Sequence, residues 1–252
     1  MKPTRAKPRI LIVNDDGIHG EGLRPLIEAL RQLGRVTTVV PERERSTASH
    51  SLTLHKPLRL TKVAGEIHTL NGTPADCARF GVLNLMKERV DLVVSGINRG
   101  HNLGQDVLYS GTVAAAAEAT LLGIPAIALS RGLGPGGYEA GAAFARTLAR
   151  TVLKEGLPRG RVLNVNFPPL PASRMRGVRL TRLGDRVYDK KIVVRTDPRG
   201  DSYFWMAGRR VKNVLANGTD VRAIADRCIA ITPLTLDTTD YAGLADMEAW
   251  GL

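Results

Sequence analysis

Aromatic residues are scarce in this chain of 252 residues, and cysteines are scarcer still. Phe, Trp and Tyr make up 4% of the sequence, too few for the interleaved stacking residues of a single-strand nucleic-acid binder. The only two cysteines, Cys77 and Cys228, each lie inside an apolar segment and form no metal-ligand or redox spacing. We therefore expect no cysteine metal centre, and a reducing, cytoplasmic location.

Long hydrophobic runs are absent as well. No apolar run approaches the roughly 20 residues that a membrane-spanning helix needs. The run at residues 10–13 is also too short for the core of a secretory signal, so we expect residues 1–8 to form a tail and the protein to have no membrane contact. Repeats and low-complexity segments are missing, and 43% hydrophobic with 24% charged residues excludes general disorder.

Acidic residues are outnumbered by basic ones, 24 against 36, which gives a formal net charge of +12. The segment 174–212 alone carries twelve Lys and Arg against four Asp. Such a field concentrates anions, whether phosphorylated metabolites, polyphosphate or nucleic acid. Nucleic-acid binding stays open as an additional property, but we do not expect it to be the main function.

Strand-like apolar runs alternate with helical periodicity over residues 9–170, which predicts a doubly wound α/β domain with a mostly parallel sheet. After the prolines at 168–171 the pattern changes to short alternating runs. They predict a β-rich extension over residues 171–252, with β-hairpins or an extended arm and a return to the core. The predicted core strands are 9–14, 36–40, 91–95, 126–129 and, as the last strand of the core, 162–166. The predicted helices are 21–33, one capped by Thr73, 111–122 and 141–153, and a long loop is expected over 96–110. The extension is expected to end in a short helix at 221–225, a strand at 228–232 and a helix from 241.

Two adjacent carboxylates, Asp15 and Asp16, follow the first predicted strand. Ionised side by side, they repel each other unless a cation is shared between them, and a divalent metal is the obvious candidate. The ligand crevice of an open parallel sheet lies beyond the carboxyl ends of its strands, where this pair falls. The alternative is a simple turn with an Asx cap, because Asp, Asn and Gly are common turn formers.

Two further segments place side-chain oxygens at strand ends. Ser46 and Thr47 follow the second strand, and Asn98 and Asn102 follow the strand at 91–95. Hard cations such as Mg²⁺ and Mn²⁺ prefer carboxylate, carbonyl and water oxygens. Each segment alone is an ordinary turn pattern, but together with the paired carboxylates they predict an all-oxygen metal site.

Ser110, Gly111 and Thr112 open a predicted helix, whose first turn offers free backbone N–H groups and the positive end of the helix dipole. Phosphate binds at such positions. Gly111 lets an anion approach the backbone closely, while Ser110 can serve as a plain N-cap with or without a ligand. A metal loop that faces a phosphate loop predicts metal-assisted hydrolysis of a phosphoryl group, with Asp15 or Asp16 accepting the proton of the attacking water.

Five segments together resemble, in order and spacing, the SurE family of survival-protein nucleotidases: residues 14–17, 41–49, 71–77, 95–102 and 109–112. The resemblance spans nearly the whole chain and implies a Rossmann-like fold. It implies that one Mg²⁺ or Mn²⁺ per subunit is held by Asp15, Asp16, Ser46 and Asn98. The residues on the phosphate or substrate side are then Asn14, Asn102, Ser110, Gly111 and Thr112.

The same resemblance implies a 5′-nucleotidase that hydrolyses nucleoside 5′- and 3′-monophosphates, with action on short polyphosphate. It also implies a dimer or tetramer in which part of the C-terminal region exchanges between subunits. The match is loose after residue 171, which includes the Arg-rich stretch.

Two other phosphoryl-transfer classes fit the residues less well. A phosphoacceptor receiver domain needs an acceptor Asp at the end of the 91–95 strand, where Ser95 and Gly96 stand. A haloacid-dehalogenase phosphatase needs an Asp two residues before a second Asp, a place that Val13 and Asn14 occupy here.

Overall fold

The protein is described from a computed structural model, which covers residues 7–87, 89–188, 191–206 and 210–251. Most of the predicted N-terminal tail, and residues 189, 190 and 207–209 of the basic segment, lie outside the described residues. The strands are β1 (Arg9–Val13), β2 (Arg35–Pro41), β3 (Leu60–Ala64), β4 (Ile67–Leu70), β5 (Leu92–Arg99), β6 (Ala126–Arg131), β7 (Arg161–Phe167), β8 (Val178–Leu180), β9 (Arg186–Tyr188), β10 (Ile192–Thr196), β11 (Ser202–Met206), β12 (Arg210–Asn213) and β13 (Ile229–Thr235). The α-helices are α1 (Leu23–Arg31), α2 (Pro74–Phe80), α3 (Gly111–Leu121), α4 (Glu139–Glu155), α5 (Asp220–Ala225) and α6 (Tyr241–Glu248), with shorter turns η1 (Gly81–Leu85), η2 (Gly104–Leu108) and η3 (Ala172–Arg174).

Nine of the described strands form one sheet in the order β3-β4-β2-β1-β5-β6-β7-β13-β8. All pairs from β4 to β7 are parallel, while β3 and β13 run antiparallel to their neighbours β4 and β7. The predicted doubly wound, mostly parallel α/β sheet is therefore confirmed. The direction of winding reverses at β1, and ligands of such sheets bind beyond the carboxyl ends of the strands at this point.

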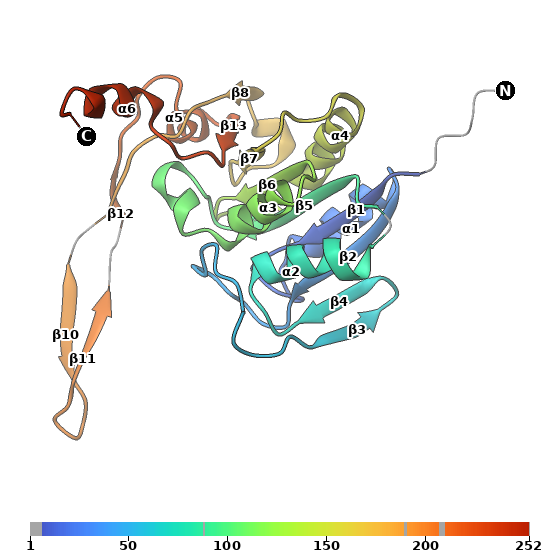
Figure 1. Ribbon diagram of the computed structural model, residues 1–252, viewed down its shortest axis with the longest axis horizontal. Coiled ribbons are helices and arrows are strands. Elements are labelled where there is room, and N and C mark those ends of the chain that lie inside the picture. Colours follow the sequence, from blue (N-terminus) through green and yellow to red (C-terminus); the bar gives the residue numbers. More distant parts are fainter. Residues whose placement is uncertain (1–6, 88, 189–190, 207–209, 252) are drawn as a thin grey trace.

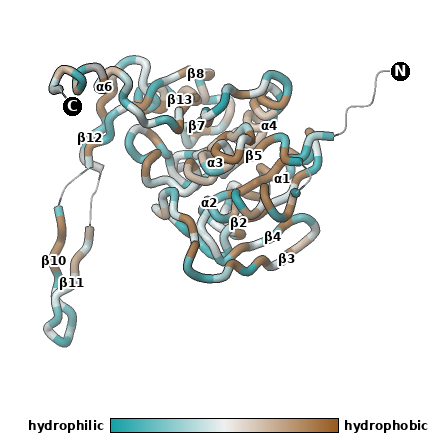
Figure 2. Tube along the Cα trace, in the orientation of Figure 1, coloured by the Kyte–Doolittle hydropathy of each residue, from teal (hydrophilic) through white to brown (hydrophobic). Residues whose placement is uncertain are grey.

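Helices cover both faces of the sheet (Figure 1). α1 and α4 pack together on one face, and α2 and α3 pack together on the other. Ile10 and Ile12 of β1 belong to the first core, while Leu11 and Val13 belong to the second. Successive side chains of a strand point to opposite faces, so β1 is buried on both sides and reads as one continuous apolar run. Figure 2 shows the same concentration of hydrophobic residues in the central strands.

The helix α2 begins as the sequence predicts. The Thr73 hydroxyl accepts a hydrogen bond from the Asp76 backbone N–H (3.0 Å), and the Asp76 carboxylate accepts one from the Thr73 N–H (2.8 Å). Pro74 stands at the first helical position, where its missing N–H costs nothing. This reciprocal pair satisfies two backbone donors at the helix start and fixes where α2 begins.

Two predictions about the core strands are wrong: the end of β5 and the place of β7 as the last strand. β5 does not end at Ser95: after an irregularity in its pairing with β6 it continues to Arg99, with Ile97 buried and Asn98 opposite Ser130. The expected loop at 96–110 is correspondingly shorter and contains η2. β7 is also not the last strand of the core, since β13 and β8 lie beyond it in the same sheet. The proline cluster that suggested an end to the core marks only the exit from β7.

The helices match their predicted positions within a few residues. α4 is the longest described helix, with 17 residues, and extends two residues beyond its predicted bounds at each end. Across the described ranges, no helix combines the length and the apolar character that crossing a membrane requires.

Residues 186–213, which we call the arm, project from the body of the molecule (Figure 1). Their described parts form two antiparallel pairs, β9 with β12 and β10 with β11, which confirms the predicted hairpins. The outer pair exposes a set of large apolar side chains: Ile192, Val194, Phe204, Trp205 and Met206. A two-stranded hairpin is marginally stable by itself in water, so a partner surface would stabilise the arm.

Candidate functional site

The turn after β1 is closed by Asn14. Its Nδ2 donates to the Gly17 carbonyl (2.9 Å), and its Oδ1 accepts from the Gly17 N–H (3.1 Å). Gly17 has a φ of +78°, which glycine adopts without strain. The Asx turn weighed as an alternative is therefore present, and it presents Asp15 and Asp16 in succession. Asn14 itself is buried, with both polar ends of its side chain used inside the turn.

Asp15 is buried, with 4% of its surface exposed. Its Oδ1 accepts a hydrogen bond from the Thr112 hydroxyl at 2.5 Å. Burial raises the pKa of the Asp15 carboxyl to about 6; the hydrogen bond from Thr112 opposes the rise, and the charge of Asp16 adds to it. A carboxylate in this position is costly when ionised, and a bound cation would remove that cost.

Asp16 is half-buried beside the end of β5. Its Oδ2 accepts a hydrogen bond from the Arg99 backbone N–H at 3.0 Å, which ties the β1 turn to β5. Burial raises the pKa of the Asp16 carboxyl as well; the bond from Arg99 opposes this shift and the charge of Glu44 adds to it. Both carboxylates therefore have raised pKa values, for the same main reason.

A cavity of about 780 Å³ opens at this edge of the sheet. Five of the predicted site residues line it: Asp15, Ser46, Asn98, Asn102 and Ser110. Four others do not line it in the described chain, although each lies within two residues of one that does: Asn14, Asp16, Gly111 and Thr112. Predicted metal-side and phosphate-side residues thus share one cavity, although they come from four separate segments.

Ser46 lies in the exposed segment between β2 and β3, and hydrogen bonds on both sides hold this segment in place. The Arg45 N–H donates to the Asp15 carbonyl (2.8 Å), and the Ser49 hydroxyl donates to the Leu108 carbonyl (2.7 Å). The Ser46 hydroxyl donates to Glu44 at 2.5 Å. These contacts bring Ser46 to the cavity although no strand carries it there.

One buried carboxylate fastens the same segment to the helices. Glu118 of α3, whose side chain is 3% exposed, is bonded to His50 Nε2 (2.9 Å) and accepts from Arg79 Nη1 of α2 (2.7 Å). The segment that carries Ser46, α2 and α3 therefore share a single anion. No local sequence pattern predicts this contact, because the two partners of Glu118 lie far from it along the chain.

Asn98 and Asn102 lie beyond the irregularity in β5. The Asn98 Nδ2 donates to the Gly100 carbonyl (3.0 Å), so its side-chain oxygen is the end that can bind a cation. Asn102 is held by Asn166, whose Oδ1 accepts from the Asn102 N–H (2.9 Å), and by Ser130, which accepts from its Nδ2 (2.7 Å). Asn164 Nδ2 donates to the Asn102 carbonyl (2.9 Å). Asn164 and Asn166 were not predicted as site residues. The sequence did carry a signal for them, because two amides stand at alternate positions of a buried strand and buried polar groups need hydrogen-bond partners.

The N-terminus of α3 lies in direct contact with Asp15. Ser110 caps the helix by accepting a hydrogen bond from the Val113 N–H at 3.1 Å, as predicted. A Cβ built on Gly111 would lie only 2.9 Å from the Asp15 Cβ and 2.9 Å from Pro74 Cγ. Glycine at this position therefore permits the close approach of α3 to Asp15.

The four predicted metal ligands offer oxygens: the carboxylates of Asp15 and Asp16, the hydroxyl of Ser46 and the amide oxygen of Asn98. His101 also lines the cavity, and its Nε2 is bonded to the Phe167 carbonyl (2.8 Å). Within the described ranges, no three His, Cys, Asp or Glu side chains gather into a metal-binding group. A nitrogen or sulfur ligand set is thus not offered by these residues, whereas the oxygen set fits a hard cation such as Mg²⁺ or Mn²⁺.

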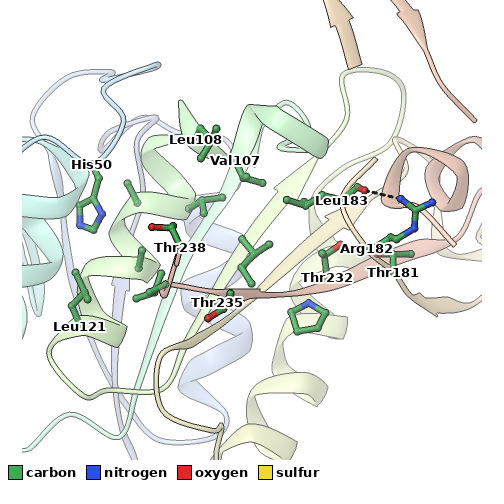
Figure 3. Close-up of a pocket in the computed structure, with 16 residues that line it drawn as sticks. His50, Val107, Leu108, Leu121, Thr181, Arg182, Leu183, Thr232, Thr235 and Thr238 are labelled. Atoms are coloured by element: carbon green, nitrogen blue, oxygen red, sulfur yellow. Dashed lines mark hydrogen bonds between the residues drawn. The ribbon is translucent and has the colours of Figure 1, made fainter. Parts of the chain in front are cut away.

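A second cavity, of about 830 Å³, lies along α3 and β13 (Figure 3). In the described chain its wall contains His50 and Arg182 but no Asp or Glu, and most of the remaining lining is apolar or Thr. Its lining offers neither paired carboxylates nor a helix N-terminus, whereas the first cavity is lined by five of the residues predicted to carry phosphoryl chemistry.

Known proteins resemble this chain over almost its full length. The family described as "Survival protein SurE" matches residues 10–190. The chain belongs to the SurE family. It is 51% identical over 245 residues to the 5′-nucleotidase SurE of Geobacter sulfurreducens, covering 96% of this chain and 94% of that relative. It is 44% identical over 248 residues to the 5′-nucleotidase SurE of Aeromonas hydrophila, covering 96% and 98%.

A solved SurE structure supports the same assignment. The crystal structure of the SurE protein from Aquifex aeolicus matches with a TM-score of 0.86 and 39% identity, over 97% of this chain and 100% of that one. The SurE resemblance expected from the five sequence segments is confirmed, and so is the fold that it implied.

Proposed function

We propose that this protein is a divalent-metal-dependent 5′-nucleotidase that hydrolyses nucleoside 5′- and 3′-monophosphates to nucleoside and phosphate. The observation that carries the proposal is the single cavity in which Asp15, Ser46 and Asn98 meet the N-terminus of α3. The SurE relatives named 5′-nucleotidases support the nucleotidase class. Short polyphosphate is a second substrate that the net charge of +12 favours.

Asp15, Asp16, Ser46 and Asn98 would hold one Mg²⁺ or Mn²⁺ per subunit. When bound, such an ion neutralises charge on the phosphoryl group and lowers the pKa of a water molecule. Asp15 or Asp16 would accept the proton of the attacking water, because these two carboxylates are adjacent at the proposed metal site. Asn14 contributes by closing the turn that presents them.

The phosphate side of the site is the start of α3 together with Asn102. The backbone N–H of Gly111 and the positive end of the helix dipole bind the phosphoryl oxygens. The Thr112 backbone N–H is hydrogen-bonded to the Asp15 carboxylate. Ser110 lines the cavity while it caps the helix. The Thr112 hydroxyl is bonded to Asp15, so Thr112 links the two halves of the site.

We further propose a dimer or tetramer in which part of the C-terminal region exchanges between subunits. The exposed apolar side chains of the arm, those of Leu244, Met247 and Trp250 in and after α6, and the largely apolar second cavity all favour burial against another copy. Cys77 and Cys228 are free and buried, which fits a cytoplasmic location.

A nucleotide panel tests the proposed activity. The full-length protein is incubated with 5′- and 3′-mononucleotides and with short polyphosphate, in Mg²⁺, in Mn²⁺ and in chelator, and released phosphate is measured. We expect hydrolysis of the mononucleotides with metal, loss of activity in chelator and recovery when metal is restored. Turnover that is insensitive to chelator would contradict the metal role, and absence of mononucleotide turnover would contradict the nucleotidase.

A further inference from the structure

Four residues of the arm line the same cavity as Asp15 and Asn98. One is the basic residue Lys191, and the other three are Tyr188 of β9, Ile192 of β10 and Met206 of β11. A metal ion and a phosphoryl group need polar partners, so these three side chains supply a wall that the proposed hydrolysis does not require. At about 780 Å³ the cavity has the size of pockets that enclose a whole small molecule.

Tyr188 is fixed in place although it belongs to the projecting arm. Its hydroxyl donates to the Asp106 carboxylate, which also accepts from the Arg186 guanidinium. The side chains of Arg186 and Asp106 are 8% and 16% exposed, so this ion pair is largely shielded from water. The Arg186 guanidinium lies over the Tyr188 ring, 5.8 Å from its centroid, within the range of a cation–π contact.

The anchor of Tyr188 comes from the phosphate side of the site. Asp106 belongs to η2, the turn that leads directly into Tyr109 and Ser110. The adjacent Gln105 adds two bonds to the start of the arm, donating to Asp185 (3.0 Å) and accepting from the Arg186 N–H (3.0 Å). The first residues of the arm are therefore fastened to the segment that delivers Ser110, and their position relative to a bound phosphate is set.

We propose that Tyr188, with Ile192 and Met206 beside it, forms the subsite for the nucleobase of the substrate. This inference rests on the proposed nucleotidase function, since it assigns the part of the cavity that phosphate and metal leave unused. An aromatic ring stacks on every base, and Ile192 and Met206, which are exposed in this structure, offer apolar contacts beside the ring. The subsite therefore selects nucleotides over phosphomonoesters without a base, and it accepts purines and pyrimidines alike.

The test compares two substrates that differ only in the base. AMP and ribose 5-phosphate carry the same sugar and phosphate, and their hydrolysis is measured with the full-length protein and its Tyr188→Ala variant. We expect the KM for AMP to rise roughly tenfold or more on loss of stacking, with kcat within about twofold and ribose 5-phosphate kinetics unchanged. Tyr188→Phe keeps the ring but loses the hydroxyl bond to Asp106, so it should raise the KM for AMP less than Tyr188→Ala does. The matched control is Tyr203→Ala, an exposed arm tyrosine that does not line the cavity in the described chain.

Adenosine binding separates this proposal from the proposed function, because binding requires no hydrolysis. Isothermal titration should show adenosine bound by the wild type and by Tyr203→Ala, and at least about tenfold weaker binding by Tyr188→Ala. If the wild type hydrolyses neither phosphomonoester, the nucleotidase proposal fails, while the adenosine titration still decides on the subsite. Unchanged adenosine binding in Tyr188→Ala, or equal losses for AMP and ribose 5-phosphate, would overturn the nucleobase subsite.

Discussion

Asp15 combines a buried carboxyl, a raised pKa and contact with both halves of the site. Asp15→Asn and Asp16→Asn should each lower kcat/KM for nucleotide hydrolysis by at least about 100-fold, because a metal ligand and a candidate proton acceptor are lost. Loss of the repulsion between the two carboxylates should leave the melting temperature of the metal-free protein unchanged or raise it. Phosphate release and thermal unfolding in chelator measure the two effects. Glu28→Gln, which alters an exposed pair with Arg24, is the control and should change neither. Near-wild-type turnover of both variants would rule out the metal site.

The pKa of Asp15 predicts how stability depends on pH. Burial raises this pKa from 3.8 to about 6, so the folded protein keeps the proton to a higher pH than the unfolded chain does. In chelator, the free energy of unfolding should therefore fall as pH rises from about 4 to about 6, by at most roughly 3 kcal/mol. Urea unfolding of wild type and Asp15→Asn across this range measures the difference, and the fall should be smaller in the variant. Identical pH dependence in the two proteins would show that Asp15 does not titrate in this way.

At the scale of single elements, variants at the start of α3 can distinguish helix capping by Ser110 from phosphate binding at Gly111. Ser110→Ala removes the N-cap and should cost about 0.5–2 kcal/mol of stability. Gly111→Ala places a Cβ 2.9 Å from the Asp15 Cβ, so Asp15 must move. Phosphate with Mg²⁺ should raise the melting temperature of wild type and Ser110→Ala, and that of Gly111→Ala much less.

The matched control for Gly111 is Gly141→Ala in the first turn of α4. The nearest atoms to a Cβ there lie at 3.4 Å, an ordinary contact, so this variant should keep full protection by phosphate. Equal protection of all four proteins would place the anion elsewhere.

The Ser46 segment is the second element whose position can be tested. Glu118→Gln keeps the volume of the side chain but removes the charge that His50 and Arg79 share. The Mg²⁺ concentration for half-maximal activity should rise several-fold, with kcat at saturating Mg²⁺ close to wild type, because Ser46 is held less firmly. Activity titrations with Mg²⁺ provide the measurement. An unchanged Mg²⁺ requirement would mean that the segment keeps its place without Glu118.

Elements with short-range signals were predictable from the sequence. Thr73 with Asp76 marked the start of α2, and Ser110 marked the start of α3, because a capping bond spans only three residues. The continuation of β5 to Asn98 was not predictable, since it depends on β6 beside it. The contacts of Glu118 with His50 and of Tyr188 with Asp106 join residues 68 and 82 positions apart, and no local pattern encodes such pairs.

At the scale of the whole molecule, exposed apolar side chains of the arm predict association. Trp205→Glu places a charge on the outer hairpin and should shift the protein to a smaller species in sedimentation velocity, with the fold retained by circular dichroism. Thr196→Glu adds the same charge at an exposed polar position of the same hairpin and should leave the assembly intact. A wild type that sediments as a monomer at every concentration would contradict the proposed assembly.

The order of the last two strands has a consequence for synthesis on the ribosome. β8 precedes β13 in the chain, yet it lies outside β13 in the sheet and pairs only with it there. The strands from β1 to β7, with the turns that follow them, carry Asp15, Asp16, Asn98 and Asn102. All of these strands leave the ribosome before β13 does. The nascent chain can therefore bring these site residues together while β8 is still unpaired, because β13 has not yet been synthesised. Because the arm lies between β8 and β13 in the chain, closure of this sheet edge and docking of Tyr188 belong to the last stage of folding.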